Sequence, residues 1–285
     1  MSATRAMEPV TEAAADAAIG AAASALHLPT VRAEASGLAD EAARAALTHR
    51  AYLAEVLSAE VDQRNGRRCA RRIVEARFPR IKRLSDFDLG AAPAINPATF
   101  AALAAGAWID DGEPVCLIGD SGTGKSHLLI GLGIAACEAG RRVRYVTCAS
   151  LVNELAEAAD ERTLSKLVAR YGRLDLLCLD EVGYVGVDAR GAELLFQVIT
   201  EREERASIAL ASNASFSEWG RTFSDPRLAA AVVDRLTFRG PHRADRLRQL
   251  PAALGANQEG GREDLISEAR PRHGDRWAVP CRELA

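Results

Sequence analysis

Residues 119–126 read G-D-S-G-T-G-K-S and match the phosphate-binding loop pattern G-x-x-x-x-G-K-[ST]. The apolar run P-V-C-L-I at 114–118 precedes this loop, and H-L-L-I-G-L-G-I-A at 127–135 follows it. The loop therefore joins a predicted strand to a predicted helix. Glycines let the backbone turn its N–H groups towards phosphate oxygens, and a helix N-terminus adds partial positive charge. The stretch predicts a nucleotide-binding α/β fold.

Individual residues of this loop have distinct predicted roles. The chain has three lysines, Lys82, Lys125 and Lys166, so a lysine at the required motif position is informative. We expect Lys125 to reach the β- and γ-phosphates and the hydroxyl of Ser126 to bind Mg²⁺. The predicted cofactors are ATP and Mg²⁺. The predicted nucleotide-binding residues are Gly119, Asp120, Ser121, Gly122, Thr123, Gly124, Lys125, Ser126 and His127.

Strand-like apolar runs alternate with helical patterns around the loop. This alternation predicts a parallel sheet that is covered by helices on both faces. The predicted strands are 114–118, 142–147, 174–179 and 206–211. The predicted helices are 98–109, 125–139, 150–158, 189–204 and 226–238.

Polar residues end two of the predicted strands. L-D-L-L-C-L-D-E at 174–181 is apolar like a buried strand and ends in two acids. We expect Asp180 to hold Mg²⁺, directly or through water, and Glu181 to orient or deprotonate an attacking water. Asn213, after the next strand, can hydrogen-bond that water or the γ-phosphate, or it can simply be a turn residue or helix cap. Together with the loop, the two acids favour ATP hydrolysis.

Arg235 lies on the predicted amphipathic helix 226–238. One interpretation is a surface ion pair with the adjacent Asp234. The other is an arginine finger that reaches the nucleotide of a neighbouring subunit, which requires an oligomer.

A basic segment precedes the predicted ATPase core. Residues 64–83 hold nine arginines and lysines and one acid, Glu75, in a chain whose net charge is −3. The segment can be a solvated helix face or a surface that faces phosphates, and the scarcity of nearby acids favours the second. The predicted DNA-binding residues are Arg64, Arg67, Arg68, Arg71 and Arg72.

The composition of the 285 residues excludes several classes of protein. With 48% hydrophobic and 26% charged residues, a wholly disordered chain is excluded. No apolar run approaches the ~18 residues of a membrane span, and the N-terminus lacks the pattern of a secretory signal. The six cysteines contain no C-x-x-C pair, which predicts reduced thiols and neither a disulfide framework nor a zinc site. We therefore expect a cytoplasmic protein with no membrane contact.

Changes in pattern along the chain predict five segments. Residues 17–77 are helical in pattern, with Thr48 as a candidate helix cap, and Phe78-Pro79 ends the last helix. The predicted segments are a disordered extension at 1–16, a helical DNA- or partner-binding domain at 17–83, a linker at 84–97, an ATPase core at 98–239 and an atypical, poorly ordered tail at 240–285.

From about His27 to Phe238 the chain resembles the IstB-like ATP-binding helper proteins of insertion sequences, relatives of the DnaC helicase loaders in the AAA+ class. Several ordered stretches carry the resemblance besides the loop. They are H-L-P-T-V-R (27–32), A-R-F-P-R-I-K (76–82), L-S-D-F-D (84–88), S-L-V-N-E-L (150–155), L-D-E-V-G-Y (179–184), G-A-E-L-L-F-Q-V-I (191–199), S-N-A-S-F-S-E-W-G (212–220) and L-A-A-A-V-V-D-R-L (228–236).

The resemblance implies an AAA+ core preceded by a helical module. It implies Walker A roles for Lys125 and Ser126, Walker B roles for Asp180 and Glu181, a sensor-1 role for Asn213 and an arginine-finger role for Arg235. It further implies an ATP-dependent homo-oligomer that assembles on DNA and directs a transposase, encoded alongside, to its target. A DnaC-like helicase loader and a decayed, non-catalytic relative are the alternatives.

The chain departs from the resemblance at its end. Family members continue with a strand and a Ser-Tyr-Arg segment, whereas residues 240–251 read G-P-H-R-A-D-R-L-R-Q-L-P. With suitable codons, reading these residues one base later gives A-H-I-V-Q-T-G-S-D-S-Y-R. We therefore interpret 240–285 as a segment encoded after a frameshift, which the nucleotide sequence of the gene can test.

Overall fold

The computed structural model describes residues 11–90, 92, 95–184 and 186–237. The chain divides into two compact units, with the boundary between Arg71 and Arg72. The sequence-based boundary at residue 83 lies later, at the end of the basic segment. The predicted tail at 240–285, with its proposed frameshift, lies outside the described residues.

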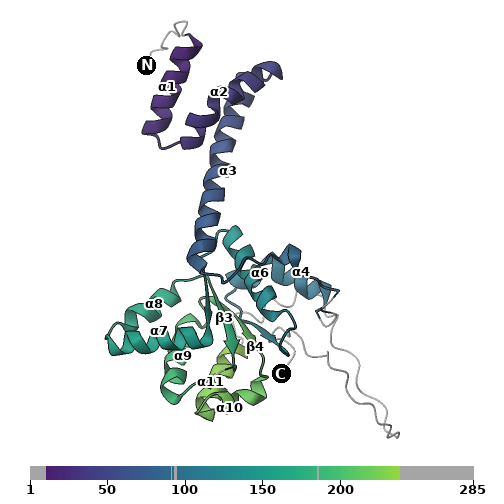
Figure 1. Cartoon of the computed structure of the whole chain (residues 1–285), viewed down its shortest axis with the longest axis vertical. Helices are drawn as coiled ribbons and strands as arrows, with labels where there is room; N and C mark the ends of the chain where they lie inside the picture. Colours follow the sequence, from purple (N-terminus) through teal and green to yellow (C-terminus); the bar gives the residue numbers. More distant parts are fainter. Residues whose placement is uncertain (1–10, 91, 93–94, 185, 238–285) are drawn as a thin grey trace, which may run out of the picture. The chain divides into compact units, whose positions relative to one another are not determined.

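The first unit consists of helices. They are α1 (Glu12–Ala25), α2 (Pro29–Arg44) and the part of α3 (His49–Ala76) that precedes the boundary. Helix α1 begins inside the segment predicted to be a disordered extension, and its run of alanines, the strongest helix formers, explains why. Helices α1 and α2 pack side by side (Figure 1). Thr48 caps α3 as predicted, because its Oγ1 accepts a hydrogen bond of 3.2 Å from the Ala51 amide.

A buried carboxylate on α3 holds the start of α2. Oε2 of Glu60 accepts hydrogen bonds from the Thr30 amide at 2.8 Å and the Val31 amide at 3.3 Å, groups that have no acceptor within their own helix. Oε1 lies 3.2 Å from Nη2 of Arg64 and 3.5 Å from Nη2 of Arg67. Desolvation opposes ionisation, but the bonds from the amides and Arg64 lower the pKa of Glu60 below its usual value.

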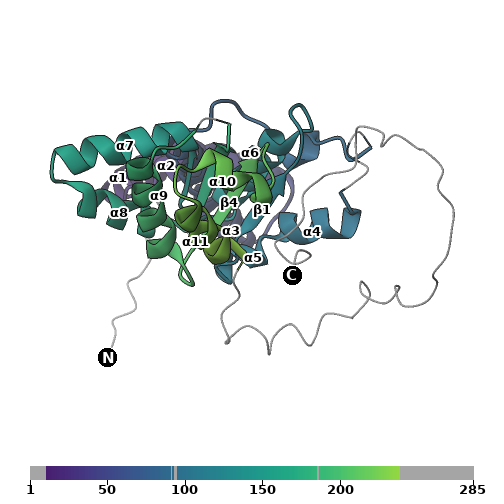
Figure 2. The same cartoon turned by 90° about the horizontal axis from the view of Figure 1, so that it is seen from below.

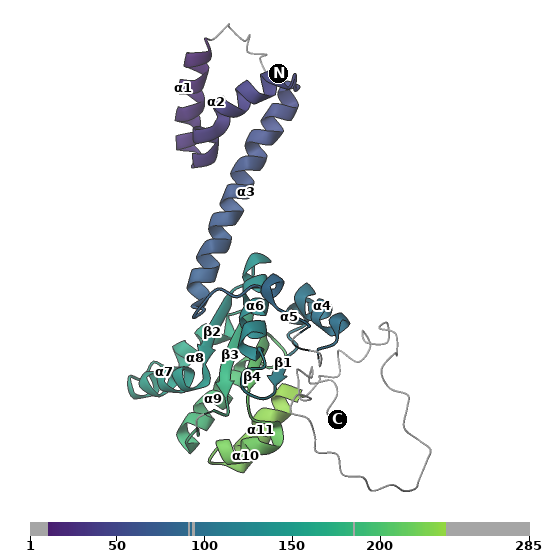
Figure 3. The same ribbon diagram turned by 45° about the vertical axis from the view of Figure 1, so that its right-hand side comes forward.

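The second unit is built on a four-stranded parallel sheet in the order β1-β4-β3-β2 (Figure 3). The strands are β1 (Val115–Ile118), β2 (Val143–Thr147), β3 (Leu176–Val182) and β4 (Ser207–Ser212). All four overlap predicted strands, although β3 ends three residues later than predicted and so includes Asp180 and Glu181, and the predicted α/β class is confirmed. Because every strand runs in the same direction, the segments that follow β1, β3 and β4 meet at one edge of the sheet.

Helices cover both faces of this sheet. One face packs against α6 (Lys125–Glu138), α4 (Pro97–Ala105), α5 (Ala107–Asp110) and the end of α3. The other face packs against α7 (Cys148–Asp160), α8 (Leu164–Gly172), α9 (Ala189–Arg202), α10 (Trp219–Thr222) and α11 (Pro226–Thr237). Helices α7, α8 and α9 lie next to one another (Figure 2). Two short 3₁₀ turns, η1 (Leu84–Asp86) and η2 (Phe216–Glu218), complete the described elements.

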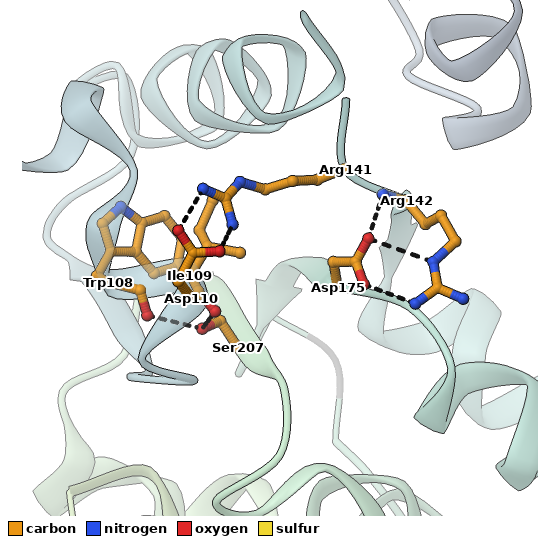
Figure 4. Close-up of polar contacts among 7 residues, drawn as sticks. All are labelled: Trp108, Ile109, Asp110, Arg141, Arg142, Asp175 and Ser207. Atoms are coloured by element: carbon orange, nitrogen blue, oxygen red, sulfur yellow. Dashed lines mark hydrogen bonds and ion pairs between the residues drawn. The ribbon is translucent and has the colours of Figure 1, made fainter. Parts of the chain in front are cut away.

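Ion pairs fasten the edge of the sheet at which the strands begin (Figure 4). Nη2 of Arg141 lies 2.7 Å from Oδ2 of Asp110, which joins the segment before β2 to α5. Asp175 accepts 2.7 Å hydrogen bonds from both the amide and Nη2 of Arg142, which joins the starts of β2 and β3. Burial of Asp175 opposes ionisation, yet the bonds from Arg142 hold its pKa below the ordinary value of 3.8.

Buried polar side chains satisfy the backbone around the start of β4. Oγ of Ser207 donates to the Trp108 carbonyl at 3.0 Å. The guanidinium of Arg202, which is 1% exposed, donates to the carbonyls of Ser207 at 2.6 Å and Leu174 at 3.1 Å, and also to that of Tyr171. Burial lowers the pKa of Arg202 to about 10, which leaves it charged at neutral pH. This edge of the sheet therefore has a structural role.

The described residues also bear on the predictions that the cysteines are reduced and that no segment spans a membrane. Cys69, Cys116, Cys137, Cys148 and Cys178 are free thiols, and all but Cys69 are buried. Within the described ranges, no helix has both the length and the apolar character that crossing a bilayer requires.

Replacing Asp175 by Asn is expected to destabilise the second unit in a pH-dependent way. A carboxyl whose pKa is lowered by folding adds stability above its unfolded pKa, and that stability is lost as the pH falls through the folded value. At pH 7 we expect the melting temperature to fall by a few degrees, on the scale of about 2–4 °C for each kcal/mol. The difference should shrink below about pH 4.

Thermal unfolding of Asp175→Asn between pH 7 and pH 3 measures this effect. Asp160→Asn is the matched control, because Asp160 pairs with Arg190 on the surface, where both side chains are more than half exposed. A loss of stability that is the same at every pH, or equal in both variants, would contradict the role of Asp175.

Candidate nucleotide-binding site

The phosphate-binding loop lies at the edge of the sheet where the strands end. It connects β1 to α6, and the Gly119 amide donates a 3.2 Å hydrogen bond to the Ser212 carbonyl at the end of β4. Gly122 and Gly124 have φ of 82° and 89°, in the left-handed region that favours glycine. A Cβ at Gly122 would meet no atom within 4 Å, so the backbone conformation and not space is the reason for glycine there.

The start of α6 provides N–H groups for an anion. Gly124 occupies the N-cap and contributes no side-chain cap, and the Leu128 amide bonds the Gly124 carbonyl at 2.9 Å. The amides of Lys125, Ser126 and His127 precede that bond in the first turn, where N–H groups have no acceptor within the helix. Such a turn attracts phosphate through its N–H groups and its partial positive charge.

The ammonium group of Lys125 is buried at the centre of the loop. The residue is 6% exposed, and its Nζ donates to the Asp120 carbonyl at 2.7 Å and lies 3.4 Å from Oγ1 of Thr123. Burial lowers its pKa, while the carboxylates of Asp180 and Asp120 act in the opposite direction. The loop thus holds a positive charge where phosphate oxygens are expected.

Asp180 is 4% exposed and fixed at both oxygens. Its Oδ1 accepts a 2.8 Å hydrogen bond from the Glu181 amide, and its Oδ2 accepts a 2.7 Å hydrogen bond from the hydroxyl of Tyr145. Burial, reinforced by the bond to Asp180, raises the pKa of Tyr145 well above its usual range, so the phenol is a proton donor. Sequence reasoning missed Tyr145, because the strand 142–147 reads R-V-R-Y-V-T and already contains other polar side chains, so nothing in its pattern distinguishes the tyrosine hydroxyl.

A β-bulge allows the two adjacent acids to share this edge. Side chains alternate between faces along a regular strand, yet Leu179 pairs with Leu210 and Val182 pairs with Ser212, so β3 has one extra residue. Glu181 lies in this bulge and has φ of 59°. This conformation costs about 1–2 kcal/mol for a residue other than glycine. Glu181 is exposed at the edge of the sheet. Backbone strain of this kind is concentrated at functional sites.

Asn213 and His127 also lie at this edge. Asn213 is exposed and follows β4, whose neighbours in the sheet are β1 and β3, so it stands between the loop and the two acids. The side chain of His127 turns to the preceding segment instead, since its Nε2 lies 3.1 Å from the Arg83 carbonyl and its ring meets the ring of Phe87 edge-on. His127 can therefore contribute its amide to the site, while its ring is engaged elsewhere.

Arg235 is not brought to the loop of its own chain. Its Nε lies 3.0 Å from Oε2 of Glu203, and its guanidinium lies over the ring of Phe196, 4.3 Å from the centroid. Glu203 follows α9 immediately and precedes β4, so this ion pair lies at the edge where the strands begin. Arg235 therefore forms an ion pair, as one of its two interpretations expected, but the partner is Glu203 and not the adjacent Asp234.

The predicted DNA-binding arginines on α3 differ in their surroundings. An open groove of about 360 Å³ in the first unit is lined by His27, Pro29, Arg64, Arg67, Arg68 and Arg71. Arg64 and Arg67 pair with the buried Glu60, and Arg64 also donates to the His27 carbonyl at 2.9 Å. Arg68 is exposed, and Arg72 belongs to the second unit. Two of the predicted DNA-binding arginines thus have a structural role as well.

The residues at the strand-end edge fit a magnesium ion that a nucleotide helps to hold. Ser126 supplies an exposed hydroxyl and Asp180 a carboxylate, and Mg²⁺ prefers such oxygen ligands together with phosphates and water. In the part of the chain described by the structure, no group of three histidines, cysteines or acids could hold a metal by itself.

The chain is similar to known ATP-binding proteins of insertion sequences. The profile of the family described as IstB-like ATP binding protein matches residues 21–246. The putative insertion sequence ATP-binding protein y4iQ/y4nD/y4sD of Sinorhizobium fredii is 33% identical over 89% of each chain. The insertion sequence IS21 putative ATP-binding protein of Pseudomonas aeruginosa is 37% identical over 70% of this chain and 75% of its own.

A likeness to a solved structure covers about half of each chain. The replication initiator DnaA bound to AMPPCP and single-stranded DNA gives a TM-score of 0.45 at 24% identity, over 53% of this chain and 46% of that one.

We expect Lys125→Ala to weaken ATP binding by at least about 100-fold. The substitution removes charge-assisted hydrogen bonds to phosphate, each of which contributes about 1.5–3 kcal/mol. Titration with a fluorescent ATP analogue measures the change. The control is Lys166→Ala, which removes an exposed lysine on α8 and should leave the affinity unchanged. Equal affinities for the two variants would contradict the assignment of the loop.

Glu181→Gln is expected to retain nucleotide and to lose turnover. The amide keeps the size of the side chain but cannot accept a proton from water, and general-base catalysis contributes typically about 10²–10⁴-fold. ATP affinity and single-turnover hydrolysis, measured on the same sample, separate the two effects. Turnover at the unmodified rate would exclude Glu181 as the base.

Proposed function

Because the chain belongs to the IstB-like ATP-binding protein family, we propose that it is an ATP-hydrolysing, DNA-binding helper that directs a transposase to its target. One observation carries the hydrolytic part of the proposal. The buried Lys125, the buried Asp180 and the exposed Glu181 converge on the edge of the sheet where β1 and β3 end. The family's relatives are named for insertion sequences, which supports a transposase encoded alongside as the partner.

In the proposed reaction each residue acts on a separate part of Mg²⁺-ATP. The amides at the start of α6 and the ammonium of Lys125 bind the phosphates, and Ser126 and Asp180 hold the metal. When bound, Mg²⁺ neutralises the charge that develops on the transferred phosphoryl group. Glu181 accepts a proton from the attacking water, and Asn213 orients that water. The bulge in β3 supports this division because it brings both carboxylates to one edge.

We place Arg235 in an ATP-dependent homo-oligomer, as the arginine that completes the nucleotide site of another subunit. Its ion pair with Glu203 lies at the opposite edge of the sheet from its own loop, which supports action on a neighbour. The ring of Phe196 under the guanidinium restricts the orientations of the side chain, so the arginine is presented in a defined direction.

DNA binding is assigned to the groove beside the start of α2. Four arginines line it, and the buried carboxylate of Glu60 neutralises part of the charge of Arg64 and Arg67. The exposed Arg68 is the best placed to contact a phosphate. A groove that binds backbone phosphates without reading bases suits a helper that assembles on many sequences.

A helicase loader with the same ATPase core is the alternative that the sequence raises. The insertion-sequence names of the relatives favour the transposase helper. A pull-down of the full chain with the transposase encoded beside it and with the replicative helicase of the same cell separates the two. ATPase assays on this chain and on a version with the family ending restored test whether the altered tail has abolished activity.

Mixing two inactive variants is expected to restore ATP hydrolysis. Arg235→Ala retains its own loop and acids, while Glu181→Gln retains its arginine, so a mixed assembly contains some complete sites. Turnover of the mixture in the presence of DNA should exceed that of either variant alone. If the mixture is as inactive as its components while both variants still assemble, Arg235 does not act on a neighbouring subunit.

The affinity for duplex DNA should fall steeply with salt, and Arg68→Ala should reduce that dependence. Each phosphate contact contributes about 0.9 to the slope of log K against log salt concentration. Fluorescence anisotropy from 50 to 200 mM salt, in ATP, gives the slope. Arg50→Ala, at the exposed start of the same helix and outside the groove, is the matched control. A slope near zero, or equal slopes for both variants, would contradict the assignment of the groove.

A further inference from the structure

Tyr145 is tied to Asp180 by the pairing of β2 with β3. In that register Tyr145 stands opposite Cys178, and Thr147 stands opposite Asp180. Because side chains alternate along each strand, Tyr145, Cys178 and Asp180 face the same side of the sheet, the side that α6 covers. The hydroxyl of Tyr145 reaches diagonally to Oδ2 of Asp180 at 2.7 Å.

This hydrogen bond is held in place from both sides. Tyr145 is 9% exposed and its ring packs against Phe78, with 6.0 Å between the ring centroids. Asp180 is 4% exposed, and its other oxygen is fixed by the Glu181 amide. With one donor on each oxygen, the carboxylate has a defined plane. Each oxygen keeps a further lone pair, since an ionised carboxylate offers about four acceptor positions.

We propose that Tyr145 is a positioning residue that orients the Asp180 carboxylate towards the Mg²⁺ ion of the nucleotide. This proposal rests on the proposed function, because Asp180 needs a defined orientation for a metal only if the chain binds Mg²⁺-nucleotide. Partners that orient a metal-binding side chain typically change metal affinity or activity by about 10–100-fold when they are removed. The phenol is the one side-chain donor to Asp180 among the hydrogen bonds of the described residues.

The chain offers a matched control for the loss of a buried tyrosine hydroxyl. Tyr171, at the end of α8, is 1% exposed, and its hydroxyl donates to Oε2 of Glu154 at 2.6 Å. This pair lies on the opposite face of the sheet, in the packing of α7 and α8. Tyr145→Phe and Tyr171→Phe therefore remove the same chemical group from the same kind of bond, and only the first removes it from the proposed site.

The experiment measures metal and nucleotide affinity separately in the full chain. A fluorescent ADP analogue is titrated in EDTA and in Mg²⁺, and Mn²⁺ binding to the ADP complex is followed by electron paramagnetic resonance. For Tyr145→Phe we expect an unchanged ADP affinity in EDTA and an apparent Mg²⁺ and Mn²⁺ affinity that is about 10–100-fold weaker. Turnover should recover as Mg²⁺ is raised. Tyr171→Phe should bind both metals like the unmodified chain.

A double-mutant cycle with Asp180→Asn tests whether the effect passes through this carboxylate. If it does, adding Tyr145→Phe to Asp180→Asn changes the metal affinity little further. Unchanged metal affinity in folded Tyr145→Phe, or an equal loss in Tyr171→Phe, overturns the proposal while leaving the proposed function intact. If the unmodified chain binds no nucleotide in Mg²⁺, the proposed function fails and this inference fails with it.

Discussion

The strand-end edge of the sheet is organised around one buried positive charge. An ammonium group as buried as that of Lys125 is unfavourable unless oxygen atoms surround it. The Asp120 carbonyl meets that need by contact, and the carboxylates of Asp120 and Asp180 meet it through space. The loop has to curl through Gly122 and Gly124 to bring the carbonyl close, and β3 has to carry an acid, Asp180, near its end. A phosphate group that enters the loop places further oxygen atoms around the ammonium group of Lys125.

The two edges of the sheet differ in the polar groups that they hold. Where the strands begin, Asp110 pairs with Arg141 and Asp175 pairs with Arg142. Arg202 donates hydrogen bonds to three backbone carbonyls there. Where the strands end, Lys125, Asp180 and Glu181 gather instead, and Glu181 has a positive φ of 59°.

Most of the core of the second unit could be predicted from the sequence, because it follows from local patterns. The loop motif, the four strands and the helices after them were recognisable from periodicity and from flanking residues. Helix α8 was missed, and the predicted helix 98–109 is divided into α4 and α5 by Gly106, which has a left-handed conformation. Tyr145 and Glu60 were missed for another reason, since their partners Asp180 and Thr30 lie 35 and 30 residues away in the chain. Such pairs depend on strand register and helix packing, which periodicity does not reveal.

The position of Arg235 also constrains the symmetry of any assembly in which it completes another subunit's site. The loop lies at one edge of the sheet and the ion pair of Arg235 with Glu203 at the other. Two different surfaces must then meet at each contact, so a two-fold dimer that pairs identical surfaces is excluded. Contacts of this head-to-tail kind close into a ring or continue as a helical filament, and they leave one unmatched site at the end of any open array.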